Sequence, residues 1–203
     1  MSLARLAARA VIGGLFIGHG TQKLFGWFDG PGPEGTAGMM ENLQLRPAKL
    51  HATLAGATET VCGGMLVAGL ETPLAAAGLT GVMTTAIRKV HLPNGPWAAN
   101  GGWEYNAVLI AAVTALAETG PGVLSLDRLR GKERKGVGWA LFSLGLGAGA
   151  ALLTMAAGER SAPQALPPAP SDPVGGNLDV AGDPVTADST EPGIAGDPTT
   201  AGS

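Results

Sequence analysis

Apolar residues dominate five stretches of the chain, and short segments rich in glycine, proline and charge separate them. The stretches cover residues 6–24, 49–70, 73–87, 105–117 and 137–157. A helix needs about 20 residues to cross ~30 Å of hydrocarbon, and the first two stretches and the last have that length. The third and fourth are shorter, but their position between full-length stretches favours counting them as spans. The pattern predicts an all-α, polytopic membrane four-helix bundle with an additional fifth C-terminal transmembrane helix.

Helix boundaries are marked by proline and glycine. Pro73 follows Thr72, and proline at the first helical position gives up no intrahelical hydrogen bond. Gly120-Pro121-Gly122 ends the fourth stretch. These signals predict the start of the third helix and the end of the fourth.

The composition divides the chain into a membrane part and a tail. Of 203 residues, 33 are glycine and only 14% are charged, which suits a membrane bundle better than a soluble core. Residues 161–203 carry no Lys or Arg, six acids and eight of the 15 prolines. We expect a four-helix transmembrane domain over 1–128, a basic cytoplasmic loop over 129–136, a further transmembrane helix over 137–157 and a disordered acidic Pro/Gly/Ala-rich tail over 158–203.

Positive charge sets the expected orientation. Arg5 and Arg9 lie near the start of the first stretch, and the loop before the fifth stretch is basic. Basic segments stay in the cytoplasm, so the amino terminus is expected there and the carboxyl-terminal tail outside. A membrane bundle has the lipid bilayer as its partner, and we expect no nucleic-acid partner. The basic residues of the loop are Arg128, Arg130, Lys132, Arg134 and Lys135.

Small residues recur at four-residue spacing in four stretches, and in the second stretch Ala55 and Gly63 lie four residues to either side of Glu59. Such stripes let the backbone of a neighbouring helix approach closely, so we expect them at helix contacts. The stripes are Ala10, Gly14 and Gly18; Ala55 and Gly63; Ala77, Gly81 and Thr85; Ala107, Ala111 and Ala115; and Gly145 and Gly149.

Polar residues gather in one half of the predicted membrane. Ionisable groups in hydrocarbon are costly, so a shared location suggests that they satisfy one another or form a site. Glu59 lies deepest, near the midplane, and its candidate partners are His19, Lys23 and Arg88. Three interpretations stay open: a structural clasp that fixes helix register, a ligand-binding or proton-handling site, and a protonated Glu59 without a role. The candidate site residues are His19, Gln22, Lys23, His51, Glu59, Arg88, His91 and Glu104.

Metal and thiol chemistry find little support. His19 and His51 lie on neighbouring stretches, but three histidines at uneven depths make a haem unlikely, and no close-spaced His or Cys pair indicates zinc. Cys62 is the single cysteine, which excludes an intrachain disulfide. Redox chemistry in this chain would need a bound cofactor or another subunit.

Several motifs in order resemble the DoxX family of bacterial inner-membrane proteins, across about residues 3–128. They are His19-Gly20-Thr21-Gln22-Lys23-Leu24-Phe25-Gly26, Gly63-Gly64-Met65-Leu66 after Glu59, Trp103-Glu104-Tyr105-Asn106, and Ser125-Leu126-Asp127. The resemblance implies a four-helix membrane bundle in the plasma (inner) membrane of a bacterium. It also implies a link to membrane redox chemistry or oxidative-stress defence, since relatives include subunits of thiosulfate:quinone oxidoreductase and of terminal quinol oxidase complexes. His19, Lys23, Glu59 and Glu104 match polar positions of the family. The fifth stretch and the tail depart from its pattern.

Two hypotheses of function follow. In the first, the chain is an accessory or quinone-interacting subunit of a membrane oxidoreductase, with protein partners in a membrane redox complex and a quinone headgroup among the candidate residues. In the second, it is a non-enzymatic membrane scaffold that recruits soluble partners. Whether the chain is itself an enzyme stays open. Nothing in the sequence resembles the two inverted halves of a transporter.

Overall fold

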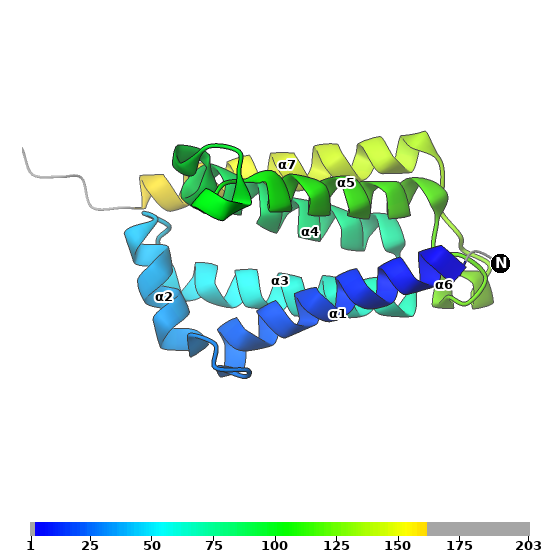
Figure 1. Cartoon of the computed structure of the whole chain (residues 1–203), viewed down its shortest axis with the longest axis horizontal. Coiled ribbons are helices and arrows are strands. Elements are labelled where there is room, and N and C mark those ends of the chain that lie inside the picture. The colour runs from blue at the N-terminus through cyan, green and yellow to red at the C-terminus, as the bar shows by residue number, and fades with distance from the viewer. Residues whose placement is uncertain (1–2, 162–203) are drawn as a thin grey trace, which may run out of the picture. The chain divides into compact units, whose positions relative to one another are not determined.

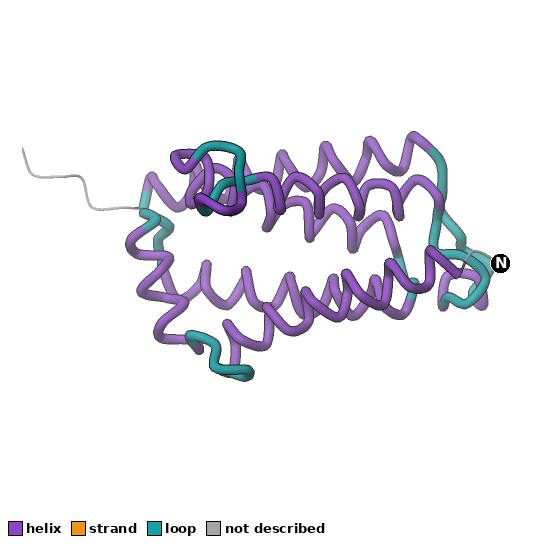
Figure 2. The backbone as a smooth tube through the Cα atoms, in the orientation of Figure 1, coloured by secondary structure: helices purple, strands orange, loops and turns teal. Residues whose placement is uncertain are grey.

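The computed structural model describes residues 3–161, and every regular element in that part of the chain is a helix (Figures 1 and 2). Most of the predicted disordered tail falls on residues 162–203, outside the described residues. Five long helices are α1 (Leu3–Phe25), α3 (Ala48–Ala68), α4 (Thr72–Ala86), α5 (Glu104–Thr119) and α7 (Val137–Arg160). Shorter elements are α2 (Gly32–Asn42), α6 (Leu126–Leu129), the π-helical η1 (Ile87–His91) and the 3-10 turns η2 (Leu92–Asn94) and η3 (Ala98–Asn100).

The five apolar stretches correspond to the five long helices. α4 begins at Thr72 with Pro73 in its first turn, and α5 ends immediately before Gly120, as predicted. α7 continues to Arg160, so the helix takes in the first three residues that we assigned to the tail. α2 was missed, because its three glycines and one proline are typical of a loop. It forms a helix because Thr36, Ala37 and Met40 are buried against its neighbours.

The long helices pack in two groups, antiparallel to their neighbours except for α4 and α7, which run in the same direction (Figure 1). α1 packs along α3, while α4 packs against α5 and α7, and contacts between α3 and α4 join the groups. In Figure 1 the short helix α2 lies across one end of the bundle, and α6 lies at the other end beside the start of α1. We call these the α2 end and the α6 end. The last residues of α7 reach the α2 end, where the Arg46 N–H donates to the Gly158 carbonyl at 3.4 Å.

Glycines allow the closest helix contacts, at predicted positions on α3 and α4 but at other positions than predicted on α1 and α7. A Cβ on Gly13 of α1 would lie 2.6 Å from the Gly63 carbonyl oxygen of α3. Gly147 of α7 is packed in the same way against Ala77 and Thr80 of α4. The expected stripes on α1 and α7 were wrong, because the helices are rotated so that a neighbouring position lies in the contact. A Cβ would have no neighbour within 4 Å at the following glycines: Gly14, Gly18, Gly145 and Gly149.

Two apolar clusters form the core. The larger lies where α1, α3, α4 and α5 meet, and the smaller joins α2, α3 and α7 at the α2 end. The larger cluster contains Phe16, Leu66, Ala75, Ala76, Leu79, Met83, Val113, Leu116 and Ala117. The smaller contains Ala37, Met40, Leu45, Ala48, Ala52, Ala151 and Met155. The smaller cluster is what holds α2 across the bundle.

The outward faces of the helices carry large apolar side chains. Val11 is 61% exposed, Val108 62% and Leu153 74%, whereas Arg9 and Asp127 are buried. This distribution is the reverse of that in a water-soluble domain, in which charged side chains are almost never fully buried. By length and hydropathy, α7 is the one helix among those of residues 3–161 that qualifies as a membrane span by itself. The other four long helices are shorter, less apolar or more highly charged.

Candidate functional site

A buried ion pair joins α1 to α3 in the half of the bundle nearer the α2 end. Lys23 Nζ lies 2.6 Å from Glu59 Oε2, and their side chains are 18% and 3% exposed. Of the three partners that the sequence offered Glu59, the structure therefore selects Lys23. The two side chains can meet because glycines bring the helices together here: a Cβ on Gly20 would lie 2.6 Å from the Gly56 carbonyl oxygen.

Two further predicted residues surround the ion pair. His19 lies one turn before Lys23 on α1, and its Nδ1 atom is 3.2 Å from Gln22 Oε1. Gln22 in turn donates from Nε2 to the Phe28 carbonyl at 3.3 Å, which holds the loop between α1 and α2. Lys23 also donates to the His19 carbonyl at 3.4 Å. His19, Gln22, Lys23 and Glu59 thus form one polar group, which we call the Lys23–Glu59 site.

A cavity of about 290 Å³ opens next to this site, between α1, α2 and the start of α3. Lys23 contributes to its wall, and an exposed ion pair at its rim joins Lys49 Nζ to Glu34 Oε1 at 3.1 Å. The cavity therefore lies between Lys23 and the surface at the α2 end. Its remaining lining residues are Leu24, Phe25, Pro33, Ala52 and Thr53.

His51 lies at the same end of the bundle but in a different environment. Its Nε2 atom is 3.2 Å from the Arg46 carbonyl oxygen, in the turn that leads into α3. Gly158 of α7 packs against the same ring. His51 thus closes the junction between α2, α3 and α7 and has no hydrogen bond to the residues of the Lys23–Glu59 site.

The other three predicted residues belong to the α4–α5 connection. His91 Nδ1 is 2.7 Å from the Gly101 carbonyl oxygen, and Glu104 Oε1 accepts from the Ala98 N–H at 2.7 Å. Through these hydrogen bonds, both side chains stabilise the conformation of the 92–103 loop. Arg88 is exposed on η1, where the neighbouring Lys89 pairs with Glu159 of α7 at 2.6 Å. The eight candidate residues therefore do not form one polar group: His91 and Glu104 bond to backbone groups of the 92–103 loop, and Arg88 is exposed.

At the α6 end the structure places a second buried charge, Arg9, which the sequence suggested only as an orientation signal. Its guanidinium donates four hydrogen bonds to backbone carbonyls and is 2% exposed. The acceptors are Leu66 at 2.9 Å, Val67 at 2.6 Å, Pro121 at 2.5 Å and Leu124 at 2.9 Å. Two of them are terminal carbonyls of α3, which have no partner within the helix. Arg9 therefore ties α1 to the end of α3 and to the loop after α5.

Asp127 completes this cluster. Its carboxylate is fully buried and accepts from the backbone N–H groups of Glu71 at 2.9 Å and Thr72 at 3.4 Å, at the start of α4. Its own N–H donates to the Gly69 carbonyl at 3.0 Å. We call Arg9 and Asp127 with these backbone partners the Arg9–Asp127 cluster. A signal for it was present, because Arg9 lies inside an apolar run where an ionisable residue is expensive.

Comparison with known proteins identifies the family of the chain. The profile of the DoxX family matches residues 4–92. Uncharacterized membrane protein Rv3486 of Mycobacterium tuberculosis is 31% identical over 143 residues, which is 66% of this chain and 85% of that protein. No solved structure matches the chain at a significant level. The chain spans most of its relative at this identity, and on that evidence it is a membrane protein that belongs to the DoxX family.

Proposed function

We propose that this DoxX-family protein is a polytopic subunit of a membrane oxidoreductase system and that it binds a quinone headgroup at the Lys23–Glu59 site. The observation that carries the proposal is the buried Lys23–Glu59 pair at 2.6 Å beside a cavity that opens at the α2 end. An ion pair of this kind is costly to bury, and intramembrane ionisable residues commonly mark functional sites.

The exposed apolar faces of the helices support placing the whole bundle in a bilayer. Charged side chains collect at the two ends, as a span requires, and the basic loop lies at the α6 end with the amino terminus. The positive-inside rule then assigns the α6 end to the cytoplasm of a bacterial plasma membrane and the α2 end to the outer face. The cavity beside Lys23 accordingly opens at the outer surface of the membrane.

The donor chemistry of Lys23 fits a carbonyl ligand. A lysine ammonium has three N–H donors and no acceptor. Glu59 takes one of these donors and the His19 carbonyl takes a second, more distant bond. The third is available to a carbonyl oxygen in the cavity, whose wall includes Lys23. A volume near 290 Å³ lies at the small end of ligand pockets, about 300 to 1,000 Å³, which suits one ring rather than a whole prenylated molecule.

The neighbouring side chains can manage protons at such a ring. A bound quinone supplies two-electron chemistry coupled to proton uptake or release. Glu59 can accept a proton through its contact with Lys23, and His19 lies one turn away on the same helix face. Glu59 is only 3% exposed and its partner Lys23 is 18% exposed, so proton exchange of Glu59 would run by way of Lys23. Electrons must come from a partner subunit, which is why we assign an accessory role.

Quinone retention tests the proposal. The protein is purified in mild detergent, lipid-soluble compounds are extracted, and bound quinone is measured against protein. We expect about stoichiometric quinone in the native protein and at least a tenfold lower content in Glu59→Gln, which loses the partner of Lys23. Glu41→Gln, which changes an exposed carboxylate on α2, is the matched control and should keep its quinone.

A colourless, quinone-free native protein that also fails to bind added quinone would overturn the proposal. In that case the membrane scaffold becomes the better description. Equal quinone contents in Glu59→Gln and Glu41→Gln would leave a quinone-binding protein but remove Glu59 from the site.

A further inference from the structure

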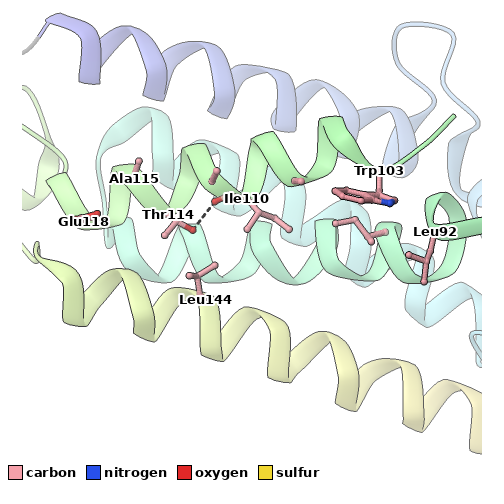
Figure 3. A pocket seen from close by; sticks show the side chains of 10 residues that line it. Leu92, Trp103, Ile110, Thr114, Ala115, Glu118 and Leu144 are labelled. Atoms are coloured by element: carbon pink, nitrogen blue, oxygen red, sulfur yellow. Dashed lines mark hydrogen bonds between the residues drawn. The ribbon is translucent and has the colours of Figure 1, made fainter. Parts of the chain in front are cut away.

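A second hollow lies far from the Lys23–Glu59 site, on the lipid-facing side of α5. It is a groove of about 730 Å³ between α5, α7 and the end of α4 (Figure 3). Leu92 and Trp103 lie at one end, Glu118 at the other, and Leu144 extends into it from α7. The full lining is Ile87, Leu92, Trp103, Ala107, Ile110, Ala111, Thr114, Ala115, Glu118 and Leu144.

The groove is long and almost wholly apolar. From Trp103 to Glu118 it follows α5 for about 22 Å, at ~1.5 Å per residue. The groove has room for a ligand because three of its lining residues, spaced four apart on α5, are alanines with small side chains. The single hydroxyl in the lining, that of Thr114, donates to the Ile110 carbonyl at 2.7 Å (Figure 3). The central part therefore offers no hydrogen-bond donor to a ligand, and an unbranched hydrocarbon chain matches its shape and chemistry.

The end of the groove at Glu118 is polar, and two basic residues outside the lining contact the neighbouring backbone. Glu118 is an exposed carboxylate in the lining. Arg5 Nη1 donates to the carbonyl of the next residue, Thr119, at 2.7 Å. Lys135 packs against Gly120, where a Cβ would lie 2.9 Å from the lysine Cβ. Arg5 and Lys135 thus contact the chain one and two residues after Glu118.

We propose that this groove binds a phospholipid, with one acyl chain along α5 and a phosphoethanolamine headgroup at Glu118. The ammonium of that headgroup complements the Glu118 carboxylate, and its phosphate complements Arg5 and Lys135. A purely anionic headgroup would gain the two cations but would meet the Glu118 charge unpaired. The inference rests on the proposed placement of α5 in the bilayer, and it does not depend on quinone binding.

Native mass spectrometry of the delipidated full-length protein tests the inference. Phosphatidylethanolamine and phosphatidylglycerol of identical acyl chains are added separately, and retained lipid is counted as collision energy rises. We expect one phosphatidylethanolamine to be retained, at least fivefold more than phosphatidylglycerol. Ala111→Leu should fill the groove and abolish retention of both lipids, because Ala111 lines its middle. Glu118→Gln should keep the acyl site but remove the preference between headgroups.

The control variant is Ala150→Leu, which adds the same side chain at an exposed position of α7 outside the groove. Equal retention by Ala111→Leu, Ala150→Leu and the native protein would overturn the site, and equal retention of the two lipids would overturn the headgroup assignment. Loss of a native dimer in Ala111→Leu alone would show that a second copy occupies the groove, which also rejects the proposal. A protein that retains phosphatidylethanolamine but no quinone supports this inference and contradicts the proposed function.

Discussion

The two ends of the bundle bury charge for different purposes. At the α6 end, Arg9 has four backbone carbonyls as acceptors and Asp127 accepts two backbone N–H groups. At the α2 end, Lys23 and Glu59 have each other, and Lys23 also lies in the wall of a cavity. The Arg9–Asp127 cluster is closed, whereas the Lys23–Glu59 site is open. A buried charge indicates a ligand site only where its hydrogen bonds are incomplete.

The backbone at the two ends reflects the same difference. At the α6 end, Arg9 and Asp127 satisfy the terminal carbonyls of α3 and the first N–H groups of α4, so three helix connections depend on two side chains. At the α2 end, the connections depend on α2, whose short apolar face packs on α3 and α7. We therefore expect the α6 end to dominate stability and the α2 end to dominate binding.

The largest expected effect is that of Arg9→Met. The change keeps most of the apolar volume but removes the donor of four backbone carbonyls. A buried acceptor left unsatisfied costs about 1–3 kcal/mol, so we expect a total loss of about 3–5 kcal/mol. Thermal unfolding in mild detergent, followed by circular dichroism, measures it. Arg5→Met is the control, since Arg5 makes one hydrogen bond at 2.7 Å and is half-buried, and it should lose no more than about 1 kcal/mol. Similar losses in the two variants would contradict the closed-cluster description.

A smaller loss is expected for Glu59→Gln, about 2–3 kcal/mol, because the partly exposed Lys23 can turn toward the cavity and water when its partner is neutral. The double variant Lys23→Met with Glu59→Leu distinguishes an ion pair that only holds the helices together from one that binds a ligand. Replacing both partners by apolar groups should restore stability to within about 1 kcal/mol while quinone stays absent. A double variant that is stable and still retains quinone would mean that the pair serves only to hold the helices.

The sequence predicted the five long helices well, because apolar runs bounded by Pro73 and Gly120 depend only on local composition. It identified Lys23 and Glu59 because ionisable groups in such runs stand out. It could not show that His91 and Glu104 fold a loop, since their acceptor and donor are backbone groups that only the folded 92–103 segment brings near. For the same reason it missed α2, whose helix depends on tertiary burial of Thr36.

The sequence also could not predict how α1 is rotated about its own axis. Gly13 and Gly14 are neighbours, yet only Gly13 faces α3. Gly13→Ala should cost about 1–3 kcal/mol, because its Cβ would meet the Gly63 carbonyl at 2.6 Å and Val67 at 2.7 Å. Gly14→Ala should stabilise the protein slightly, because its Cβ meets nothing and alanine favours the helix. The two melting temperatures should therefore move in opposite directions, and a reversed order would mean that α1 is rotated otherwise.

The smallest expected effect concerns the rim of the cavity. Lys49 and Glu34 are 78% and 82% exposed, so water and salt screen their attraction, and Lys49→Gln should change the free energy of unfolding by less than about 1 kcal/mol. The matched control at the α6 end is Arg128→Gln, which breaks the exposed pair with Glu133. Both variants are compared by melting temperature at low and high salt. A loss in Lys49→Gln as large as that in Arg9→Met would show that the rim is part of the packed structure. The α2 end would then be as tightly packed as the α6 end. The two ends could no longer be told apart as one that binds a ligand and one that is only structural.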